Sequence, residues 1–121
     1  MKLFLVFAAV SGMLSVILGA FAAHGLKAHL SSALLSAFQT GVQYQMAHSL
    51  ALLFVVLLYR HSPSSVLVYS GSFMLAGIVL FSGSLYLLAI TQVKWFGPVT
   101  PLGGLCFIIA WALLAYSAIR G

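Results

Sequence analysis

The 121-residue chain contains no aspartate and no glutamate, and its only fully charged side chains are five lysines and arginines. Charged residues make up 4% of the sequence, whereas soluble domains carry roughly a quarter. A chain with so few charges cannot cover itself with polar surface, which excludes an ordinary water-soluble domain. Without carboxylates a Ser–His–Asp triad also lacks its acid, and no Gly-x-Ser-x-Gly motif occurs. We therefore expect no catalytic residues and no enzyme activity.

Cysteine is nearly absent as well. Cys106 is the single one and lies in an apolar run, so the chain has no disulfide framework. The remaining candidate metal ligands are His24, His29, His48 and His61. A zinc site needs three or four converging ligands, but His61 is expected at the opposite membrane face from His24 and His29. Phosphate-loop and dinucleotide motifs are also missing, so we expect neither a metal nor a cofactor.

Apolar side chains dominate what is present: 64% of the residues are hydrophobic and the mean hydropathy is +1.21. Long apolar segments lie at about 3–23, 33–59, 66–90 and 101–119, separated by short polar connections. A helix needs about 20 residues to cross the hydrocarbon core of a bilayer, and each segment is about that long or longer. The sequence predicts an all-α membrane protein, with four transmembrane helices in an antiparallel bundle and one domain over 1–121.

The cations mark the ends of the segments. In a chain with four spans, Lys2, Arg60 and Arg120 fall on one side of the membrane, and Lys27 and Lys94 fall on the other. Cations accumulate on the cytoplasmic side of membrane proteins, so three against two favours cytoplasmic termini. No two cations are adjacent and no basic–aromatic patch occurs, so we expect the lipid bilayer, and not nucleic acid, as a partner.

Polar side chains concentrate between Gln39 and His48, inside the second segment. On a helix, Thr40, Tyr44 and His48 lie on one face, with Gln39 and Gln43 on its flank. Hydrocarbon does not satisfy amides, phenols or imidazoles. We therefore expect other helices to surround the second segment at this level.

Four spans bring further polar residues to the same end of the bundle, next to the first and third loops. The predicted cluster at this odd-loop end comprises His24, Gln39, Thr40, Gln43, Tyr44, Gln45, His48, Ser82, Ser84, Tyr86 and Thr100. The opposite half is nearly pure Leu, Val, Phe and Ala. We therefore predict a polar interior at the odd-loop end, closed by an apolar half beneath it. Thr100 is also expected to cap the fourth helix.

Small residues form rows along two of the segments. The first row comprises Ala8, Gly12, Ser15, Gly19 and Ala22, and the second comprises Gly103, Cys106 and Ala110. Rows at spacings of three and four let two membrane helices approach closely. We expect both rows to be helix-packing seams, with Cys106 as a packing residue.

Several stretches carry a family resemblance: Gly19-Ala-Phe-Ala-Ala-His24, Thr40-Gly-Val-Gln-Tyr-Gln-Met-Ala-His48, Leu80-Phe-Ser-Gly-Ser-Leu-Tyr86 and Thr100-Pro-Leu-Gly-Gly104, with Trp111. Together they resemble the YgdD/YwdK family (DUF423), small bacterial membrane proteins without an established activity. The resemblance covers essentially the whole chain. It implies a four-helix protein of the bacterial inner membrane and supplies no substrate or catalytic residue.

Two functional classes remain open. The first is an assembly or scaffolding protein, which docks against further copies of itself or a larger membrane complex. The alternative is an oligomeric channel or transporter that carries a small polar solute or a proton along the Gln39–His48 face. His48 could relay a proton, or it could tie helices together as a neutral imidazole. No carboxylate is present to stabilise its charged form, so we favour the neutral tether and the first class.

Overall fold

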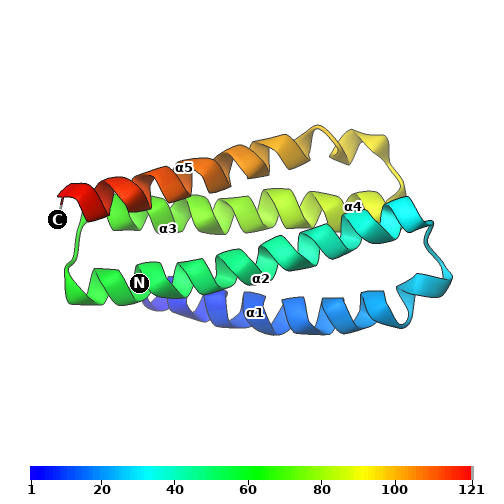
Figure 1. Ribbon diagram of the computed structural model, residues 1–121, viewed down its shortest axis with the longest axis horizontal. Coiled ribbons are helices and arrows are strands. Elements are labelled where there is room, and N and C mark those ends of the chain that lie inside the picture. Colours follow the sequence, from blue (N-terminus) through cyan, green and yellow to red (C-terminus); the bar gives the residue numbers. More distant parts are fainter. Residues whose placement is uncertain (121) are drawn as a thin grey trace.

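A computed structural model describes residues 1–120, and its long helices match the four predicted spans (Figure 1). The elements are α1 (Lys2–Ala23), α2 (Ser32–His61), α3 (Ser65–Gly77), a π-helical turn (Ile78–Ser82), α4 (Gly83–Thr91) and α5 (Val99–Arg120). Short 3-10 turns, Leu26–Ala28 and Lys94–Phe96, lie in the first and third loops. The helix α3, the π turn and α4 together form the third span. The prediction of an all-α membrane protein with four spans is confirmed.

Helix boundaries follow the polar connections. The side chains of Ser31 and Ser64 each accept a hydrogen bond from a backbone N–H in the first turn of α2 and α3, respectively. Gln92 ends α4 in the left-handed conformation, with φ of 59°. The expectation that Thr100 caps the fourth helix is wrong, because α5 already begins at Val99. The Thr100 hydroxyl lies instead against Ser84 of α4.

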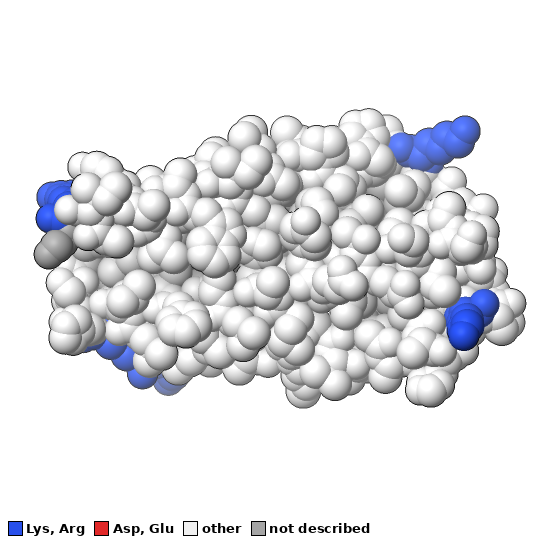
Figure 2. All heavy atoms as spheres, viewed as in Figure 1, with Lys and Arg blue, Asp and Glu red and all other residues white. Residues whose placement is uncertain are grey.

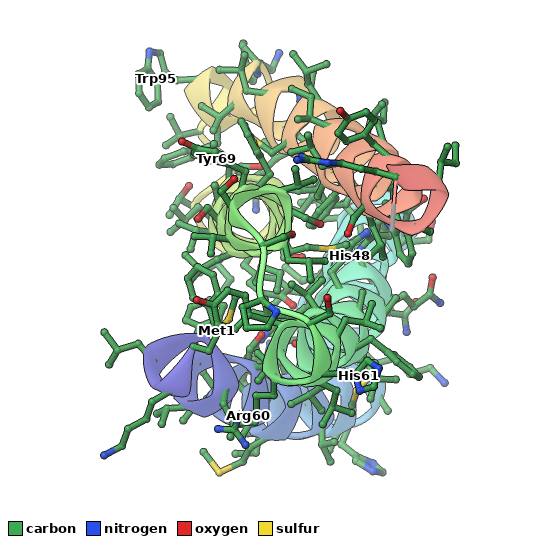
Figure 3. The ribbon with its side chains drawn as sticks, turned by 90° about the vertical axis from the view of Figure 1, so that its left-hand side faces the viewer. Met1, His48, Arg60, His61, Tyr69 and Trp95 are labelled. Atoms are coloured by element: carbon green, nitrogen blue, oxygen red, sulfur yellow. The ribbon has the colours of Figure 1, made fainter. Side chains whose placement is uncertain are left out.

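The four spans form a staggered row, seen end-on in Figure 3. The order is α1, α2, third span, α5, with α1 and α5 at the two outer edges. The first and third loops lie at one end of the bundle, and both termini lie at the other end with the loop 62–64 (Figure 1). We call these the odd-loop end and the termini end. Because α2 and the third span have neighbours on both sides, they contain most of the interior.

The surface carries its cations only at the two ends, with a broad uncharged belt between them in the view of Figure 2. Each of the four spans is long and apolar enough to cross a membrane. Exposed large apolar side chains cover the outer helices, for example Val16 on α1 and Ile108 on α5, which are 61% and 68% exposed. This distribution suits an environment of lipid along the belt and water at the ends.

Two apolar clusters fill the interior at different heights. The termini-side core contains Ala8, Ala51, Leu52, Met74 and Ala110. The loop-side core contains Ala22, Leu26, Phe38 and Ala89. The predicted apolar half is therefore present at the termini end, but a second apolar cluster also closes the odd-loop end.

Two spans approach closely where α5 crosses the π turn. A Cβ added at Gly103 would overlap the backbone nitrogen of Phe81 and lie 2.6 Å from its Cα. Only glycine therefore permits this crossing. Ser82 faces α2 and Ser84 faces α5, because residues two apart lie on nearly opposite sides of a helix, about 200° around its axis.

Candidate functional site

Gln45 joins three helices at mid-height of the bundle. Its Nε2 donates a hydrogen bond to the Ser11 carbonyl of α1 at 2.9 Å, and its Oε1 accepts one from the Tyr86 hydroxyl of α4 at 2.5 Å. The side chain is 5% exposed. The hydroxyls of Ser11 and Ser49 lie 2.7 Å apart directly beside it. Both ends of the amide are therefore used within the chain.

His48 joins α2 to α5 (Figure 3). The Trp111 Nε1–H donates to His48 Nε2 at 3.0 Å, and His48 Nδ1 lies 2.8 Å from the Tyr44 carbonyl. Because an indole N–H can only donate, Nε2 must accept, and Nδ1 then carries the hydrogen and donates to the carbonyl. The Phe107 ring stacks on the imidazole, with centroids 3.6 Å apart. This geometry holds a neutral imidazole, and Nε2 could take up a proton only after its bond to Trp111 breaks.

Serine hydroxyls complete the contacts between spans. Ser82 donates to the Gly41 carbonyl of α2 at 2.7 Å, and Ser70 donates to the Ala110 carbonyl of α5 at 2.8 Å. The hydroxyls of Ser84 and Thr100 lie 2.5 Å apart between α4 and α5. Across residues 1–120, no buried side-chain nitrogen or oxygen lacks a hydrogen-bond partner. The buried polar side chains therefore take part in contacts within and between the spans.

Gln45 lies nearer the middle of the bundle than the sequence predicted. Gln45 bonds Ser11, which lies at the middle of α1. The loop-side core, with Leu26 and Phe38, lies between these residues and the odd-loop end. Apolar side chains of the first loop and of the first turns of α2 therefore separate Gln45 from that end, whereas Ser84 and Thr100 meet close to it.

Some residues of the predicted cluster lie wholly or partly outside the interior. His24, Gln39 and Gln43 are exposed. Tyr44 is 44% exposed, but its ring packs against Phe81 of the third span, with centroids 4.7 Å apart. The Thr40 hydroxyl donates to the Ser36 carbonyl of its own helix. The expectation that helices surround α2 at this level fails here. Because α2 has neighbours on only part of its circumference, about half of its polar ring faces outward.

The small-residue rows are only partly packing seams. In the first row Ala8, Ser15 and Ala22 are buried and Gly19 faces Val42 of α2. Gly12, by contrast, has open space where a Cβ would lie. In the second row Gly103 and Ala110 are buried, while Cys106 is a half-buried free thiol.

Ser11, Ser49, Ser70 and Phe107 contribute to contacts between spans, although the predictions from the sequence did not include them. Trp111 also does so, and it had been noted only as part of the family resemblance. A signal for two of them was available. Phe107 and Trp111 follow Gly103 at steps of four, so all three share one face of α5. The serines carried no comparable signal, because serine is common in the exposed parts of the chain as well.

Comparison with known proteins agrees with this architecture. Residues 18–104 match the family described as "Protein of unknown function (DUF423)". The chain is 45% identical to the UPF0382 membrane protein YwdK of Bacillus subtilis, over 99% of this chain and 98% of the relative. It is 41% identical to the UPF0382 inner membrane protein YgdD of Escherichia coli K12, over 98% and 91%. No solved structure matches the chain.

Proposed function

Because this chain belongs to the DUF423 family of bacterial membrane proteins, for which no activity is known, we propose its role from its own geometry. It is an assembly protein of the inner membrane, and it associates with further copies of itself through the outer side of α2. We call this side the glutamine face, defined by Gln39 and Gln43. The interior contacts of Gln45 and His48 serve to hold each copy together.

The depth of the two exposed amides carries this proposal. α2 has 30 residues, so Gln43 lies about 5 Å and Gln39 about 11 Å along the axis from its midpoint. Both fall inside a hydrocarbon core whose half-thickness is about 15 Å. An amide that faces lipid there has no hydrogen-bond partner. A primary amide both donates and accepts, so two glutamine faces can pair reciprocally across a symmetric interface.

The same observation supports a second candidate, an oligomeric channel or transporter for a small polar solute or a proton. In a ring of copies, the glutamine face would line a passage between protomers. Passage through the interior of one copy is less well supported. Gln45 and His48 are both bonded, and apolar cores lie on either side of them.

Replacing both amides with leucine should disrupt self-association. We expect the Gln39→Leu/Gln43→Leu variant to associate about ten-fold more weakly, because each interhelical amide contact contributes up to about 1–2 kcal/mol in a membrane. Energy transfer between copies that carry donor and acceptor fluorescent proteins, diluted in lipid vesicles, measures this directly. Ser72→Leu is the control, because it replaces an exposed polar side chain of another span whose hydroxyl bonds only within its own helix.

Unchanged energy transfer in the double variant would contradict the proposal. Vesicles loaded with a pH-sensitive dye separate the two candidates. An assembly protein should conduct protons no faster than empty vesicles. Proton entry that the wild type supports, and that the double variant loses, would favour the channel instead.

We also propose that both termini lie in the cytoplasm, on the basis of three cations against two. Cysteines placed at Ser62 and Lys94, one at a time in a Cys106→Ser background, test this orientation. A membrane-impermeant thiol reagent applied to spheroplasts should label position 94 and leave position 62 unlabelled until the cells are lysed. The reverse pattern would place the termini outside.

A further inference from the structure

A groove of about 810 Å³ opens on the outer side of the bundle at the termini end. The last part of α2, the start of α3 and the last part of α5 form its sides. Its walls are mainly apolar and include Ala51, Phe54, Leu58, Leu67, Trp111 and Leu114. Because Trp111 lies near the middle of α5, the groove extends from the end of the bundle to the depth of the hydrocarbon core. Lipid is therefore its natural neighbour.

The outer end of this groove is cationic and hydroxylated. Arg120 and His61 line it together with Ser62 and Ser64. Figure 3 places His61 on the outer side of α2 and Arg60 apart from it, below the helix. The chain has no aspartate or glutamate side chain that could pair with Arg120. A guanidinium at the membrane interface attracts the anionic headgroups of the surrounding lipid.

We propose that this groove is a binding site for one anionic phospholipid from the leaflet at the termini end. The phosphate of the headgroup binds Arg120, with the hydroxyls of Ser62 and Ser64 within the same mouth. An acyl chain lies along Phe54, Leu67 and Trp111. Neither part alone selects this ligand, because the apolar wall would accept any acyl chain and the cation any anion. An anionic phospholipid provides both in this order along the groove.

A second, smaller groove at the same end repeats the arrangement. It measures about 280 Å³ and places Lys2 next to Phe4, Tyr59 and Val68. The cation and the apolar wall are again adjacent. Both grooves therefore favour negative lipid in the same leaflet, and the larger one offers the longer apolar wall. This proposal does not depend on the glutamine face, and either can fail alone.

Trp111 is an internal probe of the site. The chain has two tryptophans, Trp95 and Trp111, and a Trp95→Phe variant leaves the groove tryptophan as the only one. In phosphatidylcholine vesicles, we expect phosphatidylglycerol with brominated acyl chains to quench Trp111 at about five-fold lower mole fraction than brominated phosphatidylcholine. Such a factor corresponds to one cation that contacts an anionic lipid.

Three further variants decide the outcome. Arg120→Gln should abolish the preference for phosphatidylglycerol, whereas Lys94→Gln removes the same charge at the odd-loop end and should preserve it. Ala118→Phe should fill part of the groove and reduce quenching by both lipids. Equal quenching by both lipids in the wild type would overturn the proposal, as would a preference that survives Arg120→Gln.

Discussion

Gly103→Ala is expected to destabilise the protein by about 3 kcal/mol, the upper end of the usual cost of overpacking. The added Cβ would overlap the backbone of Phe81 in the π turn. A flexible side chain could move away from such a contact, but a backbone nitrogen held in a helical turn cannot. The change should appear as a lower midpoint when the purified protein is unfolded by heat or by SDS in a mild detergent.

Gly83→Ala is the matched control for this prediction. Gly83 lies at the start of α4, directly after the π turn in the third span. Nothing lies within 4 Å of where its Cβ would be. Alanine should therefore be neutral there, or stabilising by up to about 1 kcal/mol through its helix propensity. Equal destabilisation by the two substitutions would mean that the π turn, and not the crossing at Gly103, limits stability.

Gln45→Leu is expected to cost about 2 kcal/mol. The substitution removes one bond to the Ser11 carbonyl and one from the half-buried Tyr86 hydroxyl, and leucine offers neither of them a replacement. Unfolding of purified wild type and variant by SDS measures the loss. Combining Gln45→Leu with Tyr86→Phe should restore part of the stability, because the orphaned hydroxyl is then absent.

Gln43→Leu provides the comparison for Gln45. The two glutamines are two positions apart on α2, but one amide faces outward and the other is bonded to two neighbouring helices. Leucine at position 43 should leave the stability of an isolated copy unchanged within about 0.5 kcal/mol. If both substitutions destabilised the monomer equally, the assignment of inward and outward faces on α2 would be wrong.

The sequence was sufficient to predict the spans, because their hydropathy and their polar connections are unambiguous. All four predicted segments agree with the helices to within two residues at each end. The third span contains a π turn that no residue pattern indicated. That turn lies where α5 crosses at Gly103, so it depends on a contact between residues far apart in the chain.

The polar residues of α2 could be located along the helix from the sequence, but not around it. Polar side chains occupy most of the circumference between Gln39 and His48, so the pattern does not indicate which side faces inward. Gln45 and His48 face inward because Ser11, Tyr86 and Trp111 supply partners on that side. Those partners come from three other helices, and their positions follow only from the packing.

The shared contacts of Gln45 and His48 also bear on how the chain enters the membrane. The N-terminal pair of helices leaves the ribosome first, and within it each of these side chains already has one of its two partners. Gln45 reaches Ser11, and His48 reaches the Tyr44 carbonyl one turn earlier. Their second partners, Tyr86 and Trp111, are synthesised 41 and 63 residues later. During biogenesis, the side chains of Gln45 and His48 therefore each lack one hydrogen-bond partner while α1 and α2 lie in the lipid. The missing partners are supplied when the third span and α5 pack against α2.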